Sequence, residues 1–120
     1  MIKTLALCTS LVAASINAQA VDYFELDQVR VNDGPFAHAQ SKNLEYVMTM
    51  SPDRLLAPYL REAGLTPKTA SYGNWENTGL DGHIGGHYVT SLSLAYAATG
   101  RDDVKQRLQY VLDELERAQN

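Results

Sequence analysis

The sequence predicts an all-α fold built from helical hairpins, and three observations support this. Apolar residues recur at three- and four-residue spacings in four separate segments. Clusters of Gly, Pro, Asn and Ser lie between these segments, as expected for turns. The third segment is rich in small residues and the fourth is amphipathic, so the two are expected to form an αα-hairpin. An inner helix followed by an outer helix is the repeating unit of an (α/α) toroid.

Residues 1–20 are predicted to be a secretory signal peptide. Lys3 gives a positive start, residues 5–16 are mostly apolar or small, and Ala18-Gln19-Ala20 fits a small-x-small cleavage site. The apolar run is shorter than the roughly 20 residues that a membrane span needs. We therefore expect a secreted or periplasmic protein without a membrane segment after cleavage, in which residues 21–120 remain.

Charge and cysteine content exclude several functions for residues 21–120. Without Lys3 the chain keeps 9 of its 10 basic residues and all 14 acidic ones, a net charge of −5. Nucleic-acid binding needs clusters of Lys and Arg, and none is present, so no nucleic-acid partner is expected. The single cysteine, Cys8, lies in the predicted signal peptide. Residues 21–120 can therefore form no disulfide and perform no thiol chemistry.

The chain is expected to begin with an extended segment and then a first helix. Residues 21–31 alternate apolar and polar side chains, which predicts an extended arm or an edge strand. Turn residues at 32–35 end this segment, and helical spacing follows from Phe36 to about Met50. Gln40 and Asn43 lie on the apolar stripe of that helix. Each is either a satisfied core amide or a ligand contact.

A short second helix and a long loop follow. Ser51 is a suitable N-cap and Pro52 a suitable first residue for a helix that reaches about residue 63. Pro58 should kink this helix or limit it to little more than two turns. Gly64 fits the position just beyond its end. The loop over 66–82 is longer than the usual 4–6 residues, and long loops are disproportionately functional.

The last two predicted helices form the hairpin. The first starts near residues 81–83 and ends at Thr99, where Gly100 closes it. Its many small residues predict close packing on several sides. The second begins at Asp102 or Asp103 and continues to the end of the sequence, with one apolar stripe.

The long loop and the helix after it suggest a binding pocket. The loop contains Trp75, Glu76 and Asp81 among glycines that allow close approach. His83 and His87 are four residues apart, so both project from one side of the helix. This spacing also occurs in metal sites, but the glutamate of the His-Glu-x-x-His pattern is absent. No metal site is therefore predicted.

Several motifs in this order resemble the N-terminal part of the bacterial β-L-arabinofuranosidases. The resemblance covers essentially everything after residue 20 and is most specific from Tyr72 to Tyr88. The matching motifs are Asp33-Gly34-Pro35-Phe36 with Ala39-Gln40 and Asn43, Pro52-Asp53-Arg54-Leu55-Leu56-Ala57-Pro58, Tyr72-Gly73-Asn74-Trp75-Glu76, Gly79-Leu80-Asp81-Gly82-His83-Ile84-Gly85-Gly86-His87-Tyr88 and Tyr96-Ala97-Ala98-Thr99-Gly100.

The resemblance implies an (α/α)6-barrel glycoside hydrolase of which this chain is the N-terminal portion. Such enzymes release L-arabinofuranose with retention, using a zinc-bound cysteine thiolate as nucleophile and a glutamate as acid/base. These residues lie far downstream of the matched part, in chains several times longer. We therefore expect no catalytic residue and no cofactor in this chain, zinc in the full-length parent, and a barrel whose remainder is missing here.

By resemblance, the chain would supply one wall of a subsite for L-arabinofuranosides. His87, in the Gly-His-Tyr motif, and Gln40 match family positions that contact the sugar, and His83, Trp75 and Glu76 are assigned to the same substrate-binding rim. Alternatives stay open: His87 as a buried structural histidine, His83 as a brace for the loop, Trp75 as a plug above the helices. Glu76 is a poor catalytic carboxylate because two-carboxylate glycosidases need a second carboxylate across the scissile bond, and Asp81 in the same loop is a weak candidate. The rival function is a non-catalytic secreted helical module that binds carbohydrate or is structural.

Overall fold

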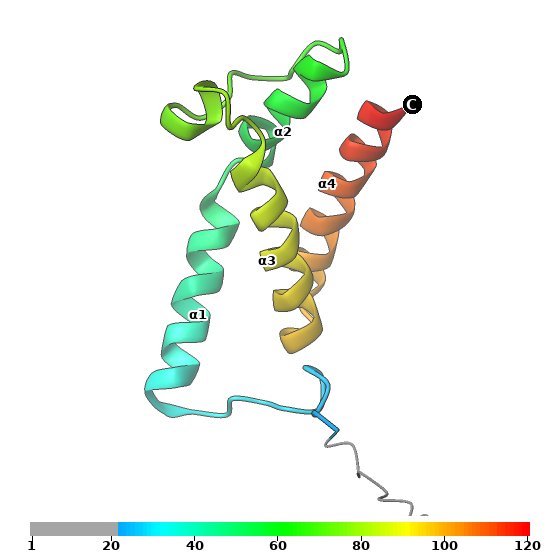
Figure 1. Cartoon of the computed structure of the whole chain (residues 1–120). Coiled ribbons are helices and arrows are strands. Elements are labelled where there is room, and N and C mark those ends of the chain that lie inside the picture. Colours follow the sequence, from blue (N-terminus) through cyan, green and yellow to red (C-terminus); the bar gives the residue numbers. More distant parts are fainter. Residues whose placement is uncertain (1–21) are drawn as a thin grey trace, which may run out of the picture.

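The computed structural model describes residues 22–120 and contains helices but no strand in that range (Figure 1). The predicted all-α class is therefore confirmed, and the edge strand that the sequence left open is not formed. The elements are α1 (Gly34–Thr49), α2 (Pro52–Glu62), the 3-10 helix η1 (Asn74–Asn77), α3 (His83–Thr99) and α4 (Asp102–Gln119). The predicted signal peptide lies outside the described residues. No helix within 22–120 combines the length and apolar character needed to cross a bilayer.

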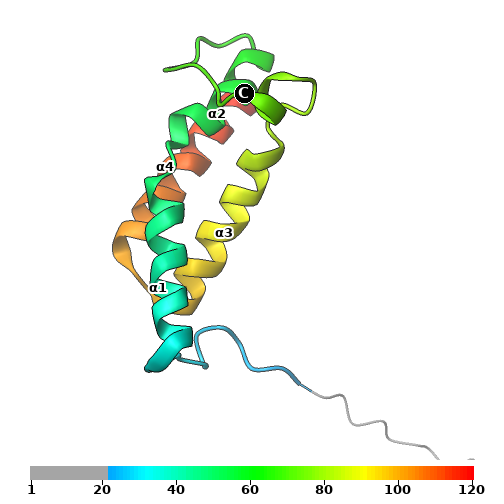
Figure 2. The same cartoon turned by 90° about the vertical axis from the view of Figure 1, so that its left-hand side faces the viewer.

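Helix α3 is the centre of the arrangement, since it packs against α1, α2, η1 and α4. It runs antiparallel both to α1 and to α4, while α2 crosses near its N-terminal end (Figures 1 and 2). Its buried residues are Gly85, Tyr88 and Leu92, at three- and four-residue spacing. They meet apolar side chains from the other helices, and the core consists of Leu44, Val47, Leu55, Leu56, Leu60, Tyr88, Leu92, Val104 and Val111.

The helix ends follow the local chemistry predicted from the sequence. The Ser51 hydroxyl accepts a hydrogen bond from the Arg54 N–H at 3.4 Å, as an N-cap does. Helix α2 continues through Pro58 to a length of 11 residues, or about three turns, so Pro58 does not limit it to little more than two turns as predicted. Gly100 ends α3 with φ +66° and donates its N–H to the Tyr96 carbonyl at 2.7 Å. Only glycine adopts this left-handed conformation readily, which explains the sharp end of the helix.

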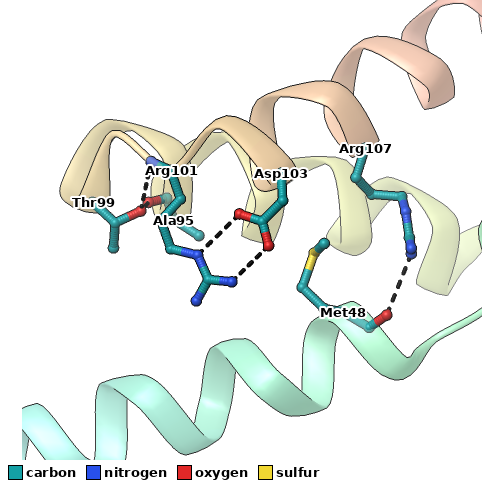
Figure 3. Close-up of polar contacts among 6 residues, drawn as sticks. All are labelled: Met48, Ala95, Thr99, Arg101, Asp103 and Arg107. Atoms are coloured by element: carbon teal, nitrogen blue, oxygen red, sulfur yellow. Dashed lines mark hydrogen bonds and ion pairs between the residues drawn. The ribbon is translucent and has the colours of Figure 1, made fainter.

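The hairpin and the end of α1 are joined by polar contacts (Figure 3). Arg101 forms two hydrogen bonds with Asp103, at 3.0 and 2.6 Å, just after α3 ends. Arg107 of α4 donates to the carbonyls of Met48 and Met50, at 3.4 and 3.1 Å. The C-terminal carbonyls of a helix have no partner within it and attract cations, so Arg107 stabilises this end of α1.

One face of α3 differs from expectation. Small residues predicted close packing on several sides, yet in the described part of the chain most of α3 apart from its one core stripe is exposed or half-buried. Leu94, for example, is 53% exposed. An apolar helix needs neighbours around its whole circumference to be buried, and α1, α2 and α4 cover only part of it.

Candidate functional site

Glu76 connects the long loop to the start of α3. Its side chain is fully buried, at 0% exposure. One carboxylate oxygen accepts the N–H of Gly82 and the other accepts the N–H of Ile84, both at 2.9 Å. The first N–H groups of a helix lack partners within the helix, and the positive end of its dipole attracts a carboxylate. Glu76 therefore caps the N-terminus of α3 from a position six residues before Gly82 in the sequence.

Glycines allow α2 to approach this end of α3 closely. The Tyr59 hydroxyl donates to the Gly82 carbonyl at 2.5 Å. A Cβ at Gly85 would lie 2.8 Å from Tyr59 Cε2 and 3.1 Å from the Leu55 carbonyl oxygen, so a larger residue would fit only if these neighbours shifted. Burial and the negative charge of Glu76 raise the pKa of the Tyr59 phenol. The neutral phenol is thereby maintained as a donor.

The carboxylate of Asp81 is also engaged in holding the loop. One of its oxygens forms an ion pair with Arg61 at 2.5 Å. The other accepts the N–H of Gly79 at 3.1 Å. Asp81 and Glu76 therefore fix the loop through separate contacts, to α2 and to α3.

The histidines and the tryptophan form an open aromatic row at the start of α3. The rings of His83 and His87 are edge to face, with centroids 4.7 Å apart. The Trp75 ring lies 6.5 Å from that of His83, and Trp75 is 61% exposed. Both histidines are exposed as well. Residues 22–120 therefore do not bury His87.

A groove between α1 and α3 adjoins this row and contains two hollows. The first, of about 220 Å3, is lined by Asn43, Tyr46, Val47, Met50, Ile84, His87, Tyr88 and Ser91. The second, of about 320 Å3, is lined by Leu26, Gln40, Asn43, Leu44, Ser91, Leu94, Ala95, Ala98 and Thr99. A larger hollow of about 450 Å3 lies between α2 and α4, and none of the predicted site residues lines it.

The predicted site residues are thus only partly brought together. Helices α1 and α3 are antiparallel (Figure 1). Gln40 shares a hollow with residues of the C-terminal half of α3, such as Ala98 and Thr99, whereas His87 lies in the first half of α3. Gln40 and His87 occupy adjoining hollows of one groove rather than the same hollow. Glu76 faces the backbone of α3, with both oxygens occupied, so its geometry does not favour contact with a ligand.

Two polar residues that line both hollows, Asn43 and Ser91, were not among the predicted site residues. Ser91 follows His87 by four positions, so helical spacing alone places the two on one face of α3. That signal was available in the sequence. Asn43 was recognised on the stripe of α1, but only the structure shows that this stripe faces α3 along the groove.

The described residues do not fit a thiolate zinc site. Cysteine is absent from residues 22–120. Within the same range no three His, Asp or Glu side chains are grouped closely enough to hold a metal ion.

Comparison with known families identifies the chain. The family model described as β-L-arabinofuranosidase, GH127 catalytic domain, matches residues 28–120, which is well over half of the sequence. No individual curated protein matches significantly. The matched range includes all four helices, the Glu76 loop and both histidines of the aromatic row. The chain therefore belongs to the glycoside hydrolase family of β-L-arabinofuranosidase GH127 catalytic domains.

Proposed function

We propose that this chain forms one wall of an L-arabinofuranose-binding subsite in a retaining β-L-arabinofuranosidase. The observation that carries the proposal is the exposed His87 ring, which stands at a hollow with apolar walls and a few polar groups within the matched catalytic domain. His83 and Trp75 extend the aromatic row beyond it. Gln40 contributes from the adjoining hollow of the same groove.

The chemistry of the hollow suits a small sugar. A neutral imidazole offers one donor and one acceptor, which matches the hydroxyls of a furanose. Exposed aromatic faces, such as that of Trp75, can lie against the apolar C–H face of a sugar ring. Drug-sized ligands occupy pockets of about 300–1,000 Å3. A hollow of about 220 Å3 is smaller and is suited to a single ring.

The hydrolytic chemistry is proposed to come from other parts of the full-length parent. Residues 21–120 contain no cysteine and so cannot supply a thiolate nucleophile. Glu76 is buried against backbone N–H groups and Asp81 is paired with Arg61, so neither faces a partner carboxylate across a bound sugar. By the same proposal, zinc belongs to that remaining part of the barrel, and the parent enzyme is secreted or periplasmic.

Binding of methyl β-L-arabinofuranoside to the 120-residue chain, measured by isothermal titration calorimetry, tests the proposal. Replacing His87 by Ala removes about 1–2 kcal/mol of hydrogen bonding and contact, so the affinity should fall about 5- to 30-fold. His38 is a matched control because it is exposed on α1 and lines neither hollow. His38→Ala should bind the sugar as the wild type does.

Two results would contradict the proposal in different ways. Equal affinity of the wild type and His87→Ala would remove His87 from the sugar subsite. Release of arabinose by this chain alone, measured with a coupled assay, would show that the hydrolytic residues are present after all. Saturable binding without turnover is the expected result, and it is also what the rival carbohydrate-binding module would give. Reconstitution of turnover by adding the remaining part of the catalytic domain would support the enzyme over the rival.

A further inference from the structure

Ser91 differs from the other serine and threonine hydroxyls of α3. Three of these hydroxyls donate to the carbonyl four residues earlier, as is usual within a helix. The Thr90 hydroxyl donates to the Gly86 carbonyl at 3.3 Å, that of Ser93 to Val89 at 2.8 Å, and that of Thr99 to Ala95 at 2.6 Å. The Ser91 hydroxyl makes no hydrogen bond to any residue in 22–120 and lines both hollows of the groove. It is therefore available to a ligand.

Asn43 stands across the groove in an equivalent position on α1. It lines the same two hollows as Ser91, and its amide likewise has no partner within the described part of the chain. The neighbouring charged residues Lys42 and Glu45 of α1 pair with each other at 2.6 Å and line neither hollow. A carboxamide has two donor hydrogens and an acceptor oxygen, and a hydroxyl can both donate and accept.

The two residues stand where the hollows meet. Asn43 lies one turn beyond Gln40 on α1, and Ser91 lies one turn beyond His87 on α3. The groove therefore has polar groups from both helices along its length, with apolar residues such as Val47 and Leu44 at its base. Apolar walls with a few convergent polar groups are typical of small-molecule sites.

We propose that Asn43 and Ser91 are further substrate-binding residues, which together hydrogen-bond the hydroxyls of a furanose held beside His87. The inference rests on the proposed sugar-binding function and adds two residues to it. A ring bound at His87 presents its hydroxyls along the groove toward the two side chains. Asn43 supplies donors from α1, and Ser91 supplies a donor and an acceptor from α3. Recognition of the sugar then requires both helices.

Titration of the 120-residue chain with methyl β-L-arabinofuranoside tests this inference with matched variants. Ser91→Ala and Asn43→Ala should each weaken binding by about 2- to 12-fold, the range for one net hydrogen bond. Ser93→Ala and Ser41→Ala are the controls on the same helices, because neither residue lines a hollow. Both controls should keep the wild-type affinity. Circular dichroism of each variant verifies that the helices are retained.

The outcomes separate this inference from the function on which it rests. Wild-type affinity in Ser91→Ala and Asn43→Ala, together with weak binding by His87→Ala, overturns the inference and leaves the proposed function intact. Weak binding by Ser91→Ala and Asn43→Ala with wild-type affinity in His87→Ala would keep the two residues as sugar contacts but would contradict the placement of the furanose beside His87. Absence of sugar binding by the wild type at millimolar concentration overturns both.

Discussion

Replacement of Glu76 by Ala should destabilise the fold more than any change to an exposed carboxylate. Glu76 is fully buried, and its two oxygens accept the N–H groups of Gly82 and Ile84, at 2.9 Å each. Alanine leaves both donors without a partner inside the protein. The N-terminal turn of α3, from which His83 projects, would then lose its only carboxylate contact within the described residues.

The size of the effect follows from these two contacts. A hydrogen bond to a charged group contributes about 1.5–3 kcal/mol. A carboxylate at a helix N-terminus gains a further 0.3–2 kcal/mol or so. Removing the buried charge also removes its desolvation penalty, which offsets part of the loss. We expect Glu76→Ala to lower the free energy of unfolding by about 2–5 kcal/mol, and Glu76→Gln, which keeps one acceptor oxygen, by about 1–3 kcal/mol.

Urea unfolding followed by circular dichroism measures this change, and hydrogen exchange of the Gly82 and Ile84 amides locates it. Glu116 is a matched control because it is exposed on α4. Glu116→Ala should alter the free energy of unfolding by less than about 0.5 kcal/mol. The capping role would be refuted if Glu76→Ala resembled this control and the two amides kept their protection from exchange.

Two further predictions concern the contact between α2 and α3. Gly85→Ala should cost about 1–3 kcal/mol, because its Cβ would meet Tyr59 and the Leu55 carbonyl at 2.8 and 3.1 Å. The neighbouring Gly86→Ala, whose closest contact would be 3.8 Å, should be neutral or stabilising by up to about 1 kcal/mol. Urea unfolding of the two variants measures the difference, and equal destabilisation by Gly85→Ala and Gly86→Ala would argue against the close packing of α2 on α3. The second prediction uses the raised pKa of Tyr59, which means that the folded state holds the phenol proton more tightly than the unfolded state. The stabilisation that this proton provides is complete at a pH below 10.0, the ordinary pKa of tyrosine, and is lost as the pH rises through the pKa of Tyr59 in the folded state. The free energy of unfolding should therefore decline above about pH 10, and it should decline less steeply in Tyr59→Phe. The same pH dependence in the wild type and in Tyr59→Phe would contradict this prediction.

The helices could be predicted from the sequence because their signals are local. The Ser51 cap, Pro52 and Gly100 set helix ends through interactions within one or two turns, and the structure confirms each. Apolar spacing likewise predicted four helical segments, and each of them forms an α-helix. The pairing of His83 with His87 follows from helix geometry alone.

Contacts between elements could not be obtained in this way. The sequence assigned Glu76 to the sugar-binding rim, but a carboxylate six residues before Gly82 becomes a helix cap only when the loop folds back on α3. The antiparallel packing of α1 on α3 decides that Gln40 and His87 lie in adjoining hollows, because it sets which turn of one helix meets which turn of the other. The sequence by itself determined the helices, their ends and the family. The tertiary structure decided which side chains meet, since local periodicity fixes the face of a helix but not the depth at which its neighbour packs.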